Sequence, residues 1–291
     1  MNKYTHLSDK IAMFVVYATL LLLACSTLLP LMQVVTVSMS PSRVINSYGL
    51  HFIPLEFDFH GYRSVFGNEG LWRAYGITIL RTVLGVSLTI VLTFCAAYPL
   101  TKKDLPHRRF WTGFILLTMF FSGGLIPSYL LVKALGLMNS LWALILPSAI
   151  NTFMMLVVRN FIMALPASLE ESAKIDGAND IVILFRIVLP LSLPIIATVG
   201  LYSGVHHWNA WFDSMIYIQD ADKHVLQLVL RNIILLGNTA EFEVTGQRNH
   251  ALDSEAIKMA ALVVSILPIL LVYPFLQKYF IKGSLMGAVK G

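Results

Sequence analysis

Six long runs of apolar residues recur along this 291-residue chain, each almost free of charge. Crossing the roughly 30 Å hydrocarbon core of a bilayer takes about 20 apolar residues in an α-helix, and these runs have that size. Only 13% of the residues are charged, against about 25% in soluble domains. The sequence therefore predicts an all-α, polytopic membrane protein with six transmembrane helices. The expected spans are Ile11–Val35, Tyr75–Leu100, Phe110–Val132, Leu141–Val158, Leu191–Ile216 and Met259–Phe280.

Basic residues mark one side of the expected membrane. With the N-terminus inside, twelve lysines and arginines fall in short inner segments, whereas eight are spread over outer segments that include the long loops Thr36–Ala74 and Tyr217–Lys258. The positive-inside rule then predicts a cytoplasmic N-terminus (1–10), one transmembrane domain (11–280) and a cytoplasmic C-terminal tail (281–291). This topology explains the formal net charge of +5, so no nucleic-acid partner is expected.

Prolines and glycines interrupt several of the expected spans. Broken helices are tolerated in a membrane where the freed backbone groups face protein or a water-filled cavity. The interruptions therefore fit a transport path, and they also fit kinks that serve only helix packing. They lie at Pro30, Gly123-Gly124, Pro127, Pro147, Pro194, Pro268 and Pro274.

Aromatic and amide side chains gather in the fourth and fifth spans. Aromatic faces beside amides suit sugar rings, which offer C–H faces and hydroxyls together. The alternative interpretation is an aromatic belt at the outer interface, where Trp and Tyr are enriched. The candidate residues for a substrate path are Asn151, Tyr202, Trp208, Asn209 and Phe212, with His206 and Trp211 near them.

The inner parts of the spans carry almost no titratable groups. Arg81, about two turns into the second span, is expected to extend its side chain to the outer interface. The lack of mid-membrane charges argues against the alternative function, a self-sufficient ion-coupled sugar carrier. No His-Glu-x-x-His, Gly-x-Ser-x-Gly or phosphate-binding Gly-x-x-x-x-Gly-Lys motif occurs. We therefore expect a non-enzymatic chain without a metal or cofactor of its own, and any driving nucleotide must bind to another subunit.

The inner segment 166–190 concentrates carboxylates in a chain that otherwise avoids them over long distances. Because the inner leaflet is itself anionic, an acidic helix here suits a protein partner with a basic or polar groove better than it suits lipid. The carboxylates belong to Glu170, Glu171, Asp176 and Asp180.

Local spacing predicts two helices in this segment. Ser168 and Glu171 have the spacing of a capping box, so the first helix is expected to begin at Leu169, and Gly177 supplies its C-terminal cap. Glu170 and Lys174 form a favourable i, i+4 pair. A second helix is expected over Asp180–Leu189, stopped by Pro190.

The same segment resembles the EAA loop of ABC-importer permeases. The matching residues are Glu171-Ser172-Ala173, Asp176-Gly177-Ala178, Phe185, Ile187, Leu189, Pro190 and Pro194, with Ser172 in place of an alanine. Trp208-Asn209 is similar to a pair in the fifth span of maltose-type sugar permeases, and Lys282-Gly283 with 287–291 is similar to their tail. Phe121–Pro147 resembles the branch that handles oligosaccharides from complex polysaccharides, such as aldouronate or pectic rhamnogalacturonan fragments.

The resemblance extends over nearly the whole chain and implies a type I ABC-importer permease fold with a cytoplasmic coupling helix. It implies a bacterial cell membrane, a second homologous permease as partner, two ATPase subunits that bind ATP and Mg, and an extracytoplasmic sugar-binding protein. Carried over by position, the residues that couple to the ATPase would be Glu170, Glu171, Ala173, Lys174, Asp176, Gly177 and Ala178. Glu171 would meet a basic group of the ATPase.

Overall fold

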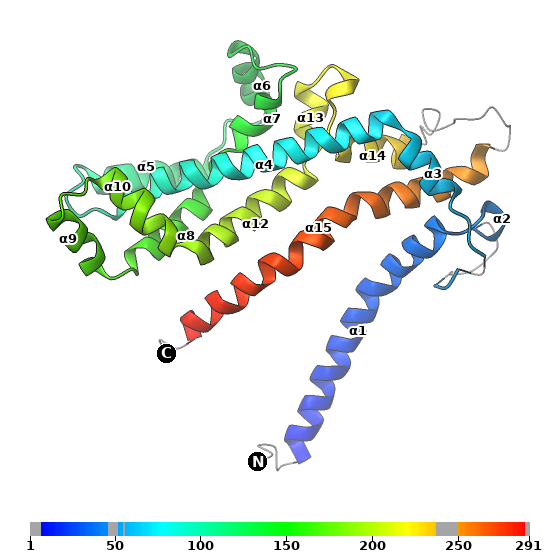
Figure 1. Ribbon diagram of the computed structural model, residues 1–291, viewed down its shortest axis with the longest axis horizontal. Coiled ribbons are helices and arrows are strands. Elements are labelled where there is room, and N and C mark those ends of the chain that lie inside the picture. The colour runs from blue at the N-terminus through cyan, green and yellow to red at the C-terminus, as the bar shows by residue number, and fades with distance from the viewer. Residues whose placement is uncertain (1–6, 46–51, 55, 237–249, 289–291) are drawn as a thin grey trace. The chain divides into compact units, whose positions relative to one another are not determined.

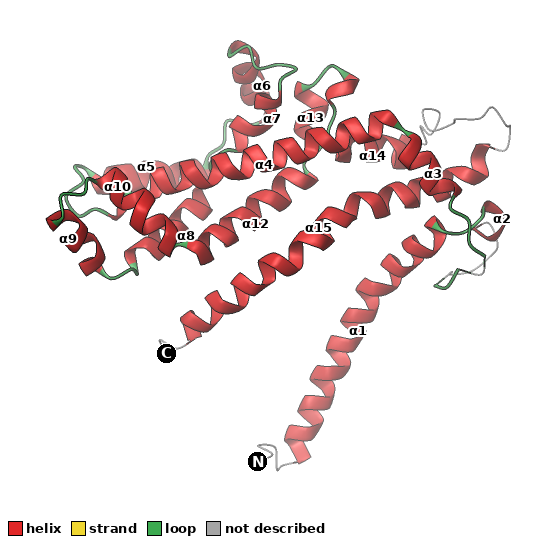
Figure 2. Ribbon diagram, viewed as in Figure 1, coloured by secondary structure: helices red, strands yellow, loops and turns green. Residues whose placement is uncertain are grey.

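The computed structural model describes residues 7–45, 52–54, 56–236 and 250–288. Within these ranges every regular element is helical and no strand occurs (Figure 2). The chain divides into two compact units, Met1–Glu69 with Leu230–Leu267, and Gly70–Val229 with Pro268–Gly291. The expected all-α class is confirmed.

Three helices of the described chain are long and apolar enough to cross a membrane by themselves, within Ser8–Ser38, Glu69–Thr101 and Glu255–Pro274. Three further candidates are bent pairs of helices, and counting each pair as one span gives up to six. The pairs are Arg108–Phe120 with Leu125–Ala134 (112°), Leu141–Ser148 with Thr152–Met163 (54°) and Asp180–Leu191 with Leu193–Asn209 (83°).

The bends lie where the sequence carries helix-breaking residues. Gly124 has a φ of 85° between the first pair, a conformation that glycine adopts without the clash of a Cβ. Pro147 lies in the 3-10 turn that ends the first arm of the second pair. Proline alone is not sufficient, because the first and last helices continue through Pro30 and through Pro268 and Pro274.

The first unit packs a short helix of the long loop, α3 (His60–Gly67), against the start of the last helix, α15 (His250–Ala288). Its elements also include α1 (Leu7–Ser38) and α2 (Ser42–Ile45). The hydroxyls of Ser38 and Tyr62 lie 2.8 Å apart and join α1 to α3. A Cβ at Gly61 would lie 2.7 Å from the Ala256 carbonyl oxygen, so only glycine allows α3 this close to α15.

The second unit is built along α4, with one apolar core near the C-terminal end of this helix and another in its N-terminal half. Figure 1 shows α9 and α10 beside one end of α4 and α6, α7 and α13 beside its middle part. Phe94 and Ala97 pack with α8, α9 and α12 in one core, and Ile77 packs with α6, α7 and α13 in the other. The elements are α4 (Glu69–Ala97), η1 (Pro99–Thr101), α5 (Arg108–Phe120), α6 (Leu125–Ala134), α7 (Leu141–Ile145), η2 (Leu146–Ser148), α8 (Thr152–Met163), α9 (Ala167–Ile175), α10 (Asp180–Ile183), η3 (Leu184–Val188), α11 (Leu189–Leu191), α12 (Leu193–Asn209), α13 (Phe212–Tyr217), η4 (Ala221–Lys223) and α14 (Leu226–Leu236), which continues into the first unit.

Candidate functional site

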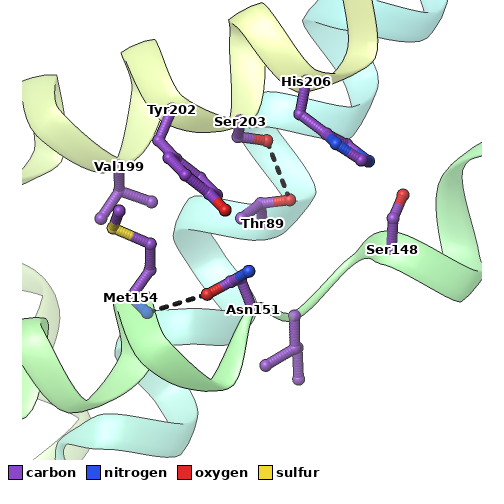
Figure 3. A pocket seen from close by; sticks show the side chains of 9 residues that line it. Thr89, Ser148, Asn151, Met154, Val199, Tyr202, Ser203 and His206 are labelled. Atoms are coloured by element: carbon purple, nitrogen blue, oxygen red, sulfur yellow. Dashed lines mark hydrogen bonds between the residues drawn. The ribbon is translucent and has the colours of Figure 1, made fainter. Parts of the chain in front are cut away.

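A cavity of ≈ 150 Å³, here called the central pocket, lies between α4, α8 and α12. Ser148, the last residue of η2, and Ile150 and Asn151 in the break before α8 line one side of it. Figure 3 shows side chains from these segments turned toward a common space. The lining residues are Thr89, Ser148, Ile150, Asn151, Met154, Val199, Tyr202, Ser203 and His206.

Local hydrogen bonds fix some of these polar groups and leave others for a ligand. The Asn151 side-chain oxygen accepts from the Met154 amide at 3.0 Å and so caps α8. The Ser203 hydroxyl donates to Thr89 at 3.3 Å across α12 and α4. The amide nitrogen of Asn151 and the exposed side chain of Tyr202 remain beside the cavity (Figure 3). An aromatic face thus meets hydroxyl and amide groups, the combination that sugar binding uses.

Two more open hollows adjoin the central pocket and share His206 with it. One, the α13 pocket of ≈ 350 Å³, is bounded by α7, by Asn209 and by Phe212 on α13. The other, of ≈ 490 Å³, runs along α12 past Thr198 and Tyr202. Thr198, Tyr202 and His206 are four residues apart, which places them on one helix face. Residues on one face of α12 are therefore shared between the hollows: Tyr202 lines two of them, and His206 lines all three.

The structure places four of the five predicted path residues in these hollows. Asn151 and Tyr202 line the central pocket, and Asn209 and Phe212 line the α13 pocket. Trp208 is buried instead, with its ring 5.7 Å from the ring of Tyr75 on α4, and it lines none of the three hollows.

Thr89, Ser148 and Ser203 line the central pocket and were not predicted. A signal for the α4 contribution does exist in the sequence. Polar or small residues recur on α4 with helical spacing, and all of them are buried in an otherwise apolar helix. The stripe consists of Thr78, Arg81, Gly85, Thr89 and Thr93.

Arg81 does not extend to the outer interface, so that expectation was wrong. Its side chain is fully buried and pairs with Asp213 on α13. It also donates to the carbonyls of Leu144 at 3.1 Å and Ala210 at 3.2 Å. The carboxylate and the two carbonyls take the place of water as hydrogen-bond partners of the guanidinium. Burial of the charge without such partners would cost far more free energy than burial with them. Arg81 therefore ties α4 to α7 and to the α12–α13 junction beside the α13 pocket.

The short helix of the acidic segment is α9, and its start differs from the expectation. The helix begins at Ala167 after Pro166, with no side-chain cap. Ser168 is its second residue, so Ser168 and Glu171 do not form the predicted capping box. Pro166 is the residue before the helix, with φ −59° and a non-helical ψ of 124°, and the helix starts two residues earlier than expected.

The predicted glycine cap at the other end of α9 is confirmed. Gly177 has a φ of 82°, its amide donates to the Lys174 carbonyl at 3.1 Å, and the next amide, of Ala178, donates to the Ala173 carbonyl at 2.9 Å. This 6→1 and 5→2 pair of bonds is the Schellman motif. It turns the chain sharply and brings α10 back beside α9.

The second predicted helix is not one continuous α-helix ended by Pro190. Asn179 caps α10 by accepting from the Val182 amide at 2.9 Å, and a π-turn, η3, follows before α11. Pro190 lies inside α11, because the widened turn before it accommodates a residue that lacks an amide hydrogen. The bend instead comes at Ser192, the residue between α11 and α12.

An ionic cluster, here called the anchor cluster, holds α9 and α10 to the end of α4. It consists of Tyr98, Lys102, Glu170, Lys174 and Asp180. Lys102 pairs with Glu170, lies 3.4 Å from Asp180 and donates to the Tyr98 hydroxyl at 2.6 Å. Glu170 also forms the predicted i, i+4 pair with Lys174 at 3.5 Å. Burial lowers the pKa of Lys102, and the neighbouring Asp180 carboxylate opposes this shift.

The predicted coupling residues divide into an inward and an outward set. Ala173 is buried in the core near α8, Ala178 packs against that core, and Glu170 turns to Lys102. Glu171, Lys174, Asp176 and Gly177 are exposed. Ile175, which was not predicted, is 87% exposed. It lies four residues after Glu171, so one face of α9 presents a carboxylate and a bare apolar side chain together.

Comparisons with known proteins identify the family. Residues 107–284 match the family of binding-protein-dependent transport system inner membrane components, and the chain belongs to this family. The polygalacturonan/rhamnogalacturonan transport system permease protein YtcP of Bacillus subtilis (strain 168) is 41% identical over 277 residues, covering 95% of this chain and 97% of that protein. Protein LplC of the same organism is 42% identical, covering 91% and 90% of the two chains.

Solved structures give the same result for the fold. A chain of a crystallised bacterial ABC transporter, involved in the import of the acidic polysaccharide alginate, is similar with a TM-score of 0.87 and 30% identity, covering 96% of this chain and all of that one. The resemblance to ABC-importer permeases inferred from the EAA-like loop and the expected permease fold are therefore both confirmed.

Proposed function

We propose that this chain is the non-catalytic permease subunit of an ATP-driven importer, and that its central and α13 pockets form part of the path of an oligosaccharide. The central pocket carries the proposal, because the Tyr202 ring, the Asn151 amide and the Ser148 hydroxyl line one cavity. An aromatic belt at the membrane surface would not require amide and hydroxyl groups to converge there. YtcP and the alginate transporter support a polysaccharide-derived substrate, and YtcP favours one from a plant polysaccharide.

The proposal includes the assembly around the chain. A second homologous permease completes the path, an extracytoplasmic binding protein delivers the sugar, and two ATPase subunits bind ATP and Mg. The chain itself needs no cofactor, and its partners include membrane lipid but no nucleic acid. The distribution of basic residues supports placing both termini and α9 in the cytoplasm of a bacterium.

The exposed face of α9 supports its role as the coupling helix. Glu171 can form an ion pair with a basic group of an ATPase subunit. Burial of the exposed Ile175 side chain in a groove of that subunit would remove apolar surface from water and so favour docking. The anchor cluster and the Schellman turn connect α9 to α4 and α12, so a force applied to α9 reaches the helices that line the pockets.

Uptake into proteoliposomes that contain the whole importer tests the substrate path. Tyr202→Leu is expected to reduce ATP-driven uptake of oligosaccharides from pectic polysaccharides at least about tenfold, because it removes a ring face that hydroxyl and amide groups surround. Tyr273→Leu is the matched control, since Tyr273 is also about half exposed but lies on α15. Equal uptake by both variants would contradict a role of Tyr202 in the substrate path and would favour the aromatic-belt interpretation. Uptake driven by an ion gradient without ATP would instead establish a self-sufficient carrier.

A charge reversal tests the coupling role of α9. Glu171→Lys is expected to leave the chain folded and inserted but to lower binding of the ATPase subunits roughly tenfold or more, because a repulsive contact replaces an attractive one. Asp104→Lys is the control, because Asp104 is an exposed carboxylate in the loop after η1. ATPase co-purification that is normal for both variants would contradict the assignment of Glu171.

A further inference from the structure

A second, chemically different pocket lies at the start of α5. Its volume is ≈ 700 Å³, and it is bounded by the loop before α5, by the first two turns of α5 and by α8. Five of its eight lining residues are basic side chains, and none is a carboxylate. The lining residues are Lys103, His107, Arg108, Arg109, Thr112, Gly113, Leu116 and Arg159. This basic pocket is separate from the hollows along α12.

The cations of the basic pocket have no carboxylate partners among the residues that the structure describes. Arg159 donates through Nε to the Leu100 carbonyl at 3.2 Å, and the Arg108 guanidinium lies 4.0 Å from the Met163 sulfur. The anchor cluster nearby shows the opposite arrangement, because Lys102 and Lys174 there pair with acids. Like charges placed together repel one another unless an anion lies between them, so the basic pocket is suited to an external anion.

The other wall of the basic pocket is apolar and follows α5 away from the charged end. Thr112, Gly113 and Leu116 lie three, four and seven residues after Arg109, so they continue one face of the helix. Gly113 leaves this wall hollow, since a Cβ at that position would have no atom within 4 Å. A charged end that opens into an apolar groove matches an amphiphile with an anionic head and a hydrocarbon chain.

We infer that the basic pocket binds the phosphate headgroup of an anionic phospholipid, with an acyl chain lying along α5 past Gly113. The inference rests on the proposed topology, which places this end of α5 at the cytoplasmic leaflet. Cytoplasmic leaflets supply anionic lipids, and basic pockets between transmembrane helices on that side recognise their headgroups. A free phosphate ion would use the arginines alone and would gain nothing from the groove at Gly113.

Native mass spectrometry of the purified full-length chain in detergent tests the inference with three probes: phosphatidylglycerol, phosphatidylcholine and inorganic phosphate. The wild-type chain is expected to retain phosphatidylglycerol over phosphatidylcholine. The double variant Arg108→Gln/Arg109→Gln is expected to weaken phosphatidylglycerol retention about tenfold or more, because two charges near the headgroup are lost. Arg63→Gln/Lys133→Gln is the matched control, because it removes two exposed basic side chains that lie outside the basic pocket.

A second variant separates a lipid from a free anion. Gly113→Leu keeps every charge and fills the groove with a residue that favours helix, so it is expected to weaken phosphatidylglycerol retention several-fold and to leave phosphate binding unchanged. Equal retention of the two lipids, or binding of phosphate alone, would overturn the inference. So would a double variant that keeps its lipid but loses the ATPase subunits, because the basic surface would then be a protein-docking site. None of these lipid measurements depends on transport, so they can fail while the proposed function stands.

Discussion

Two basic side chains, one on α4 and one just after it, are neutralised in different ways. Near the middle of α4, the fully buried Arg81 binds Asp213 and two backbone carbonyls. Just beyond the C-terminal end of α4, Lys102 is partly exposed, and its partners among the described residues are the side chains of Tyr98, Glu170 and Asp180. Backbone carbonyls are fixed by the fold, whereas carboxylates on flexible side chains can follow a moving partner. The comparison indicates that the contacts of Arg81, here called the rigid joint, hold α4 in a fixed position beside the α13 pocket. The contacts of Lys102, here called the adjustable joint, allow α9 to move relative to α4.

Neutralising Arg81 is the strongest test of the rigid joint and has the largest expected effect on stability. Arg81→Gln is expected to lower the free energy of unfolding by about 3 kcal/mol, because it leaves Asp213 without its buried partner. Thermal and denaturant unfolding in detergent, followed by circular dichroism, measures the loss. Arg73→Gln is the control on the same helix, since the Arg73–Asp222 pair is largely exposed, and it is expected to cost less than about 1 kcal/mol. Equal losses in the two variants would show that Arg81 is not a rigid joint.

The turn after α9 gives the next largest expected effect. Gly177→Val places a β-branched residue at a φ of 82°, which is expected to cost about 2 kcal/mol and to unfold the Schellman turn. ATP hydrolysis by the assembled importer is then expected to continue while uptake falls, because α9 no longer transmits its movement. Gly177→Asn is the matched control, since asparagine tolerates this backbone conformation. If both variants take up sugar normally, the turn is not required for coupling.

The same contrast explains how much the sequence could predict. Hydropathy predicted an all-helical membrane chain because burial in lipid imposes a length and composition on each helix separately. The glycine cap of α9 was predictable because its hydrogen bonds join residues only a few positions apart. The break at Gly123-Gly124 was predictable for the same reason, since one residue determines the local backbone.

Contacts between distant segments escaped prediction. Arg81 looked like an interfacial residue because its partner Asp213 lies 132 positions away, and nothing local marks the pair. Likewise, Glu170 was paired in the sequence only with Lys174, four residues on, whereas its ion pair with Lys102 joins residues 68 positions apart. In the central pocket, Asn151 and Tyr202 were found by their chemistry, whereas Thr89 and Ser203 required knowledge that α4 packs beside α12.

Breaking the adjustable joint is expected to give the smallest loss of stability of the three, and the loss is expected to be local. Lys102→Gln removes an ion pair whose two side chains are 14% and 31% exposed. Lys174 still lies 3.5 Å from Glu170 and glutamine can still donate a hydrogen bond, so the variant is expected to cost only about 1 kcal/mol. The loss should be confined to the attachment of α9. In hydrogen exchange measured by mass spectrometry, amides of Ala167–Ile175 are therefore expected to exchange up to about fivefold faster, with α4 unchanged. Lys103→Gln is the control, because this neighbouring lysine lies outside the anchor cluster. A loss of amide protection throughout the second unit in Lys102→Gln would contradict this assignment. It would mean that the Lys102 contacts are fixed to the core as firmly as those of Arg81.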